Sequence, residues 1–133
     1  MDAIVNAAKT TLLGGGGVDG AIHRAAGPEL LAECRSLGGC LPGDAKLTSG
    51  YRLPARHVIH TVGPDRHAGQ TDPVLLRSAF DASLELAVEL GCRCVALPAV
   101  SAGAYGWEAG EVARIAVASA RALAARADTV DGL

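Results

Sequence analysis

Four consecutive glycines at residues 14–17 constrain this chain more than any other feature of its sequence. They stand between a short apolar segment, Ala3–Ala7, and an apolar helical pattern that begins at Val18. Each glycine adds backbone freedom that folding must remove, so a run of four needs a compensating use. Between a strand and a helix, glycines let main-chain N–H groups approach a ligand, and the helix N-terminus adds positive charge. The run therefore predicts a site for a phosphate or a diphosphate.

Asp19 follows the glycines closely, at a place where a carboxylate would repel a phosphate. The carboxylate is compatible with such a site only if it faces another part of the ligand. The combination therefore indicates a phosphorylated ligand with a second, reactive end. Capping of a helix that begins at Gly20 is the other role for Asp19; it is worth about 1 kcal/mol and does not exclude catalysis.

Length favours one small domain over residues 1–133, and composition argues against several classes of partner. Half of the residues are apolar but only 3% are aromatic, so aliphatic side chains must build the core. The net charge of −2 argues against duplex nucleic acid, because binding its phosphates needs a basic face. No apolar run approaches the roughly 20 residues of a membrane span, so we expect no membrane association.

The spacing of the four cysteines does not match the paired CxxC ligands of zinc sites. We expect reduced thiols with structural roles and a cytoplasmic protein. These residues are Cys34, Cys40, Cys92 and Cys94.

The order of strand and helix patterns predicts helices that cover a mostly parallel or mixed sheet. The expected strands are Ala3–Ala7, Ala45–Thr48, Val58–Val62 and Cys94–Leu97, and the expected helices are Val18–Ala26, Pro28–Leu37, Pro73–Leu90 and Glu108–Ala125. One face of the third helix carries Leu76, Phe80, Leu84 and Val88, and the inner stripe of the fourth carries Val112, Ile115, Ser119 and Leu123.

Two glycine-containing loops follow expected strands, one after Ala7 and the other, Ser101–Trp107, after Leu97. Ligands of such sheets bind beyond the carboxyl ends of the strands. We therefore expect the two loops to hold one ligand from both sides.

A dinucleotide-dependent dehydrogenase is an alternative, because residues 15–20 satisfy the pattern GxGxxG. Residues 8–13 separate the expected strand from the glycines, however, and no acidic residue ends a second strand about 20 residues later. The dehydrogenase interpretation would require preferential binding of NAD. A Walker A loop is excluded, since no GK[ST] follows the glycines.

Four segments occur together in an order and at a spacing that resemble the macrodomain family, most closely its MacroD-like branch. They are VNAA at 5–8, LLGGGGVDGAIHRAAGPEL at 12–30, HTVGP at 60–64 and LPAVSAGAYGW at 97–107. The resemblance implies a three-layer α/β/α fold with a mixed sheet. It also implies a partner that is ADP-ribose, O-acetyl-ADP-ribose or a mono-ADP-ribosylated protein, with no metal and no cofactor.

The resemblance further implies roles for individual residues. Asp19 matches the catalytic aspartate that orients or activates a water. The first loop would hold the distal ribose and its phosphate with Gly14, Gly15, Gly16, Gly17 and Val18, and the second would hold phosphate and ribose with Ser101, Ala102, Gly103, Ala104 and Tyr105. Pro98 falls on the adenine side, and Asn6 is either architectural or lines the ribose pocket. His23 and His60 are expected as core or rim residues rather than metal ligands.

Two departures from the family pattern affect these expectations. Lys9 replaces the second asparagine of the family motif NAAN; its charge could pair with Asp19 or a phosphate and weaken the carboxylate as a base. The second departure is that three elements of the family fold have no matching pattern in this sequence. They are the first strand, with its adenine-binding aspartate, the last strand and the last helix. The strand ending at Leu97 would then be an unpaired edge, through which we expect a homodimer unless the chain is a piece of a longer one.

The sequence thus predicts a hydrolase of ADP-ribosyl esters that removes acetyl groups from O-acetyl-ADP-ribose or mono-ADP-ribose from protein carboxylates. The alternative is a non-enzymatic module that only binds ADP-ribose.

Overall fold

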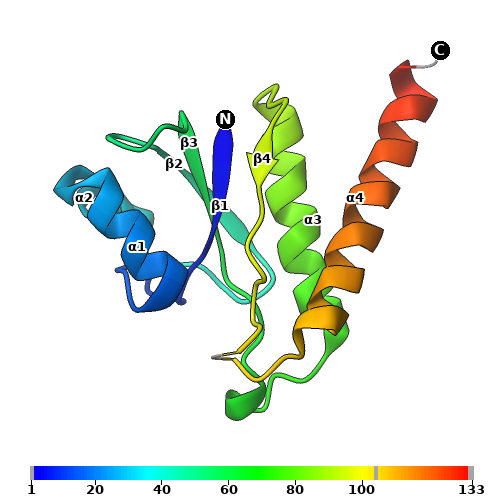
Figure 1. Ribbon diagram of the computed structural model, residues 1–133, viewed down its shortest axis with the longest axis horizontal. Coiled ribbons are helices and arrows are strands. Elements are labelled where there is room, and N and C mark those ends of the chain that lie inside the picture. Colours follow the sequence, from blue (N-terminus) through cyan, green and yellow to red (C-terminus); the bar gives the residue numbers. More distant parts are fainter. Residues whose placement is uncertain (1, 104, 132–133) are drawn as a thin grey trace.

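The computed structural model describes residues 2–103 and 105–131, with side chains as far as Arg126 (Figure 1). Its elements, in chain order, are β1 (Ala3–Ala7), α1 (Gly17–Ala26), α2 (Pro28–Leu37), β2 (Ala45–Ser49), β3 (His57–Thr61), the 3₁₀ helix η1 (Arg66–Ala68), α3 (Pro73–Glu89), β4 (Val95–Ala96) and α4 (Ala109–Asp131). Every predicted strand and helix is present, which confirms the α/β class. The main differences are that β4 has only 2 residues and that α4 continues beyond Ala125.

The four described strands form a mixed sheet in the order β2-β3-β1-β4. Strand β1 pairs in parallel with both β3 and β4, whereas β2 runs antiparallel to β3. In the β1–β3 register, Val5 lies opposite Ile59 and Asn6 opposite His60. Strand β4 lies at the edge of the described sheet, as the sequence predicted.

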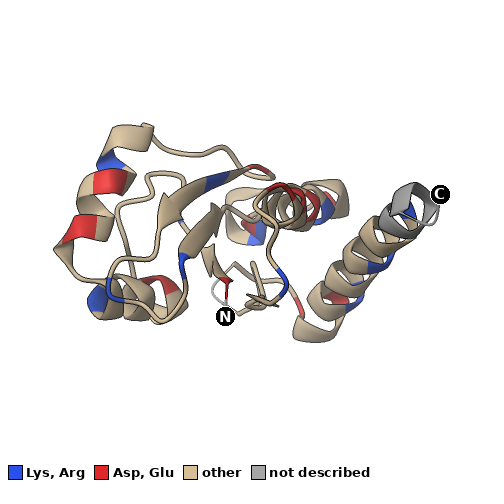
Figure 2. Ribbon diagram, turned by 90° about the horizontal axis from the view of Figure 1, so that it is seen from above, with Lys and Arg blue, Asp and Glu red and all other residues tan. Residues whose placement is uncertain are grey.

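Helices cover both faces of this sheet, which makes three layers (Figures 1 and 2). On one face, Ile22 of α1 and Leu30 of α2 pack in a cluster with Val58. On the other face, Ala87 of α3 packs with Ile59. Helix α4 lies alongside α3 in both views.

The helix starts follow local sequence signals. Pro28 and Pro73 stand at the first turns of α2 and α3, where a missing N–H costs no hydrogen bond. The side chain of Asp72 caps α3 by accepting a hydrogen bond of 2.9 Å from the Val74 N–H.

The predicted inner face of α3 is confirmed at Leu76, Phe80 and Leu84, which are buried, but not at Val88, whose exposed fraction is 55%. Four residues turn a helix by about 400°, so each step of four drifts about 40° from the starting face. After three steps the side chain has left the core, and Ala87 occupies the buried position instead. On α4 the predicted stripe is confirmed: Val112 and Ser119 are buried, and Ile115 and Leu123 are half-buried.

Basic and acidic positions are spread over several helices, strands and loops rather than gathered on one element (Figure 2). Within the part of the chain that the structure describes, no helix combines the length and the apolar character needed to cross a membrane.

Candidate functional site

A cavity of about 600 Å³ lies where β1 and β4 end. Because these strands are parallel neighbours, the loops that follow them meet at the same edge of the sheet. The loop after β1 and the start of α1 line the cavity with Lys9, Gly16, Gly17, Val18 and Asp19, and the loop after β4 lines it with Pro98, Ser101, Ala102 and Tyr105. Both glycine-containing loops therefore line one cavity, whereas their contact with a ligand stays a prediction.

The glycine loop needs glycine at specific positions. Gly14 and Gly17 have φ values of 88° and 59°, in the left-handed region that side chains rarely adopt. A Cβ on Gly20 would clash with the backbone oxygen of Gly15, so glycine lets the first turn of α1 pack against the loop. That turn directs its N–H groups and its dipole toward the end of the cavity, which suits an anion.

Gly14 and Gly15 do not line this cavity but a shallower groove on the side of His23. A Cβ on Gly14 would make ordinary contact with the His23 ring, and a Cβ on Gly15 would clash with the side chain of Lys9. Lys9 itself is exposed at the rim of the main cavity.

Asp19 lies in the first turn of α1 and lines the cavity, although only 5% of its surface is exposed. Its Oδ1 atom accepts a hydrogen bond of 2.9 Å from Asn6 Nδ2, and His23 Nε2 lies 3.4 Å from the same oxygen. Its Oδ2 atom has no hydrogen-bond partner among the described residues. A buried carboxylate with one oxygen fixed and the other without a partner has the capacity to accept one more hydrogen bond or a proton.

The alternative capping role of Asp19 is wrong. Helix α1 begins at Gly17, with Gly16 as its N-cap, and no side chain caps this end. Asp19 is therefore already inside the helix, and its carboxylate points to Asn6 rather than to a free backbone N–H.

His23 and Asn6 are placed by their contacts with Asp19. His23 stands one turn after Asp19 on α1, so the two side chains share a helix face. Sequence reasoning treated this histidine as a rim residue; the spacing of four on the predicted helix was the signal for its proximity to the carboxylate. Asn6 is fully buried beneath Asp19 and is not among the residues that line the cavity.

Beneath Asn6 lies His60, a buried histidine of β3 as the sequence predicted. Its Nδ1 atom is 3.2 Å from Asn6 Nδ2, and its Nε2 atom is 2.8 Å from Thr48 Oγ1. Burial, with a smaller contribution from His23, lowers the pKa of His60 to about 4. The imidazole is therefore neutral at physiological pH.

The second loop is held by close packing at Ser101. This residue has a φ of 68°, and its buried hydroxyl has no hydrogen-bond partner among the described residues. The hydroxyl lies so near Gly63 that a Cβ there would clash with it. Gly63 also lines the cavity, and sequence reasoning missed it, although the HTVGP segment contained the signal. Burial, followed by the charges of Asp65 and Asp19, raises the pKa of Tyr105.

Two other residues of this loop need separate mention. Gly103 has a φ of 71° and does not line the cavity. Ala104, which the sequence assigned to ligand binding, lies outside the described residues.

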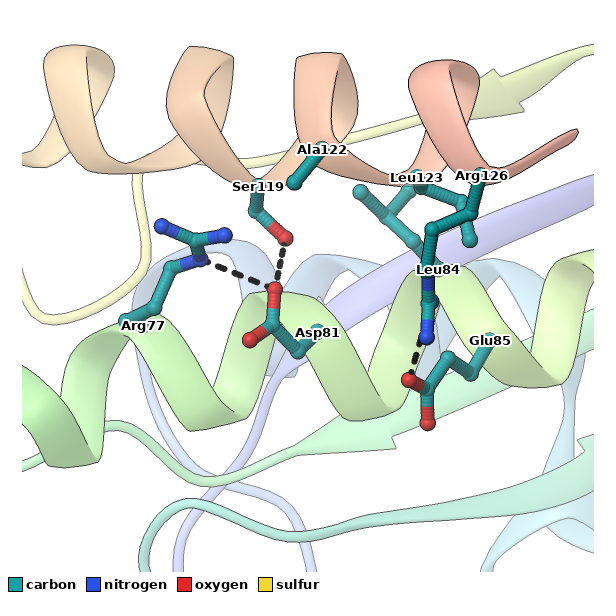
Figure 3. A pocket seen from close by; sticks show the side chains of 8 residues that line it. All are labelled: Arg77, Asp81, Leu84, Glu85, Ser119, Ala122, Leu123 and Arg126. Atoms are coloured by element: carbon teal, nitrogen blue, oxygen red, sulfur yellow. Dashed lines mark hydrogen bonds and ion pairs between the residues drawn. The ribbon is translucent and has the colours of Figure 1, made fainter. Parts of the chain in front are cut away.

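A smaller cavity of about 220 Å³ lies between α3 and α4 (Figure 3). Asp81 accepts hydrogen bonds there from Arg77 Nε, at 2.9 Å, and from the Ser119 hydroxyl. Arg126 pairs with Glu85 across the same interface. These charges are matched by partners within the protein, so the arrangement explains the packing of α4 on α3 rather than a ligand site. Nowhere among the described residues do three His, Cys, Asp or Glu side chains gather in a way that could hold a metal ion.

Comparison with known proteins identifies close relatives of this chain. The family described as Macro domain matches residues 5–116. A macro domain-containing protein of Chlorobaculum tepidum is 59% identical over 126 residues, which are 94% of this chain and 73% of that protein. The ADP-ribose glycohydrolase MACROD1 of Rattus norvegicus is 52% identical over 136 residues, which cover 100% of this chain and 53% of that protein.

Solved structures share the fold. The Trypanosoma brucei macrodomain in complex with ADP-ribose superposes with a TM-score of 0.84 at 50% identity, over 90% of this chain and 50% of that chain. The Oceanobacillus iheyensis macrodomain with ADP has a TM-score of 0.80 at 41% identity, over 89% of this chain and 66% of that chain. The present chain thus spans about half the length of the Trypanosoma protein.

Proposed function

The chain belongs to the macro domain family, and from this premise we propose that it binds ADP-ribose and hydrolyses ADP-ribosyl esters. The substrates would be O-acetyl-ADP-ribose, mono-ADP-ribose on a protein carboxylate, or both. One observation carries the proposal: the buried carboxylate of Asp19, with one oxygen fixed by Asn6 and the other unpartnered, lines the cavity that both glycine-containing loops share. The relatives named as ADP-ribose glycohydrolases support a hydrolase activity, and the ester substrates are the finer part of the proposal.

The two loops suggest how the ligand would be oriented. The diphosphate would lie against the N-terminus of α1, where the first backbone N–H groups have no partner within the helix, and against the loop that contains Ser101. The distal ribose would then face Asp19 and Tyr105, and the adenine would extend toward Pro98. This orientation keeps the carboxylate away from the diphosphate, which it would repel.

Hydrolysis would use the available oxygen of Asp19. A water whose proton is accepted by Oδ2 attacks the ester carbonyl, or the anomeric carbon when the ester joins ribose to a protein carboxylate. With the acetyl ester, the bond from the carbonyl carbon to the ribose oxygen breaks, that oxygen takes the proton from Asp19, and the acetic acid formed releases its own proton to solvent. With the protein ester, the bond from the anomeric carbon to the carboxylate oxygen breaks, the carboxylate leaves as an anion, and Asp19 passes the proton to solvent. The products are ADP-ribose and a carboxylate in both cases, and no redox partner is required.

Calorimetry with ADP-ribose, followed by an ester-hydrolysis assay, tests the proposal. The variant Asp19→Asn keeps the side-chain shape and an acceptor for Asn6 but removes the base. We expect hydrolysis to fall by about 100-fold or more while ADP-ribose affinity changes by less than about threefold. Glu89→Gln, at an exposed position of α3, is the matched control and should change neither.

Other outcomes favour the alternative functions. Binding of ADP-ribose without turnover, unaffected by Asp19→Asn, would favour a module that only binds this ligand. Preferential binding of NAD would favour the dehydrogenase interpretation.

Lys9 is part of the proposed site because it lies at the cavity rim, where the family motif has asparagine. We propose that hydrolysis persists with this modified site, since Lys9 makes no ion pair within 4 Å among the described residues. Lys9→Asn should leave activity equal or higher; complete loss of turnover would instead assign Lys9 a catalytic role.

The proposal also covers assembly and location. The outer side of β4 has no paired strand within the described sheet, and an unpaired edge favours association with a second copy through backbone hydrogen bonds. A monodisperse monomer in light scattering would contradict this homodimer. The four cysteines are unpaired, which supports a reducing cytoplasm as the working compartment.

A further inference from the structure

The buried side of Asp19 is connected to a buried histidine that the proposed reaction does not use. We infer that His60 is a positioning residue, which acts through Asn6 to hold the Asp19 carboxylate in the orientation that hydrolysis needs. The inference rests on the proposed function. Neither His60 nor Asn6 lines the cavity, so neither is expected to touch the substrate.

Three elements contribute to this arrangement. His60 lies on β3, Asn6 lies directly opposite it on β1, and Asp19 stands above on α1. The Asn6 amide nitrogen is 2.9 Å from Asp19 Oδ1 and 3.2 Å from His60 Nδ1. One NH₂ group therefore connects the carboxylate to the imidazole.

The direction of each hydrogen bond follows from the chemistry of the groups. An ionised carboxylate can only accept, so the Asn6 amide must present its NH₂ group to Asp19. The second N–H of this group faces His60 Nδ1, which must then be the unprotonated, accepting nitrogen. The imidazole proton consequently lies on Nε2, which donates to Thr48 Oγ1 at 2.8 Å.

The neutral state of His60 agrees with this assignment, since a charged imidazole would direct an N–H toward the Asn6 NH₂ group.

The surroundings of this arrangement are closed to solvent, because Asn6 and His60 are both fully buried. On the far side of the imidazole, the sulfur of Cys34 lies 3.8 Å from Nε2, and burial raises the pKa of that thiol to about 11, so it stays protonated.

The role of His60 follows from what the amide could do without it. Asn6 Oδ1 has no hydrogen-bond partner among the described residues, so the oxygen end of the amide does not set its orientation. If His60 no longer accepted a hydrogen bond, the NH₂ group would be held by Asp19 alone. The amide and the carboxylate bonded to it would then be free to move together, and Asp19 Oδ1 would lose its fixed position.

Two substitutions of His60 separate positioning from packing. In His60→Asn, the amide oxygen stands at the same number of bonds from the backbone as Nδ1 and keeps an acceptor for Asn6. In His60→Gln, the longer amide reaches toward Thr48 but leaves no acceptor at the Nδ1 position. We expect kcat for ester hydrolysis to fall by about 10-fold to 100-fold in His60→Gln and by less than about threefold in His60→Asn. ADP-ribose affinity should change by less than about threefold in both variants, because neither residue meets the ligand.

Equal losses of kcat in the two variants, or no loss in either, would overturn the inference, since packing alone does not distinguish the two amides in this way. A fall in affinity rather than in kcat would also overturn it. These results differ from failure of the proposed function, which would appear as absent turnover in the unmodified protein.

A spectroscopic measurement tests the arrangement even if a variant does not fold or the protein has no turnover. Long-range ¹H–¹⁵N spectra of the protein with labelled histidine should show His60 at pH 7 with a proton on Nε2 and none on Nδ1. Asn6→Leu and Asn6→Asp both remove the N–H donor that faces Nδ1, the second because an ionised carboxylate cannot donate. Both variants should therefore shift the Nδ1 resonance. A proton on Nδ1 in the unmodified protein would overturn the inference.

Discussion

Acidification should destabilise this protein through His60, and the size of the effect can be calculated. Burial, with a smaller contribution from His23, lowers the pKa of His60 from 6.5 to about 4. Between these values the unfolded chain binds a proton at this residue that the folded protein does not bind. The contribution of His60 to the free energy of unfolding is therefore fully present above pH 6.5 and is lost as the pH falls toward 4.

The magnitude follows from the two pKa values. The full separation corresponds to about 3 kcal/mol of unfolding free energy, of which about 2 kcal/mol is lost by pH 5.0. His60→Asn removes this titration and leaves every other ionisable group in place. The loss of stability between pH 7.5 and pH 5.0 should accordingly be about 2 kcal/mol smaller in the variant than in the unmodified protein.

Urea denaturation followed by circular dichroism at both pH values measures this difference. Each protein is compared with itself at the two pH values, so any effect of the substitution on stability that does not depend on pH cancels. If both proteins lost the same free energy between pH 7.5 and pH 5.0, the assignment of His60 as a buried neutral residue would be refuted.

Three further predictions concern the loops and the α3–α4 interface. Gly20→Ala should destabilise the protein by about 1–3 kcal/mol, because the added Cβ would meet the backbone oxygen of Gly15. Gly16→Ala is the control: a Cβ there meets nothing within 4 Å, so this variant should melt within a few degrees of the unmodified protein. Equal melting temperatures of the two variants would contradict the close packing of Gly20 on Gly15. Ser119→Ala should cost about 1–2 kcal/mol in urea denaturation, since it removes a hydrogen bond to the Asp81 carboxylate, and an unchanged midpoint would show that this bond contributes nothing. Trp107, the one tryptophan of the chain, is buried at the end of the second loop, so its fluorescence should change when ADP-ribose binds. A flat titration alongside calorimetric binding would place the ligand elsewhere.

Much of the fold could be predicted because its signals are local. The prolines at the starts of α2 and α3, the apolar runs of β1 and β3 and the glycine run before α1 each act within a few residues. The same is true of the first loop of the site, where glycine freedom and the nearby carboxylate of Asp19 occur in one segment. The prediction that Val88 lies on the inner face of α3 was wrong, because it extended steps of four residues over three turns. The helical repeat is about 3.6 residues, so each step of four moves the side chain further from the core.

The sequence by itself determined which segments form strands and helices, which loops line the cavity and which carboxylate follows the glycines. Only the tertiary structure decided how that carboxylate is held. Asn6 and His60 are 54 residues apart, and they meet because β1 and β3 pair in one particular register. A shift of this register by one residue would turn the side chains to opposite faces of the sheet. Register depends on the packing of the whole core, so no short stretch of sequence specifies the contacts behind Asp19.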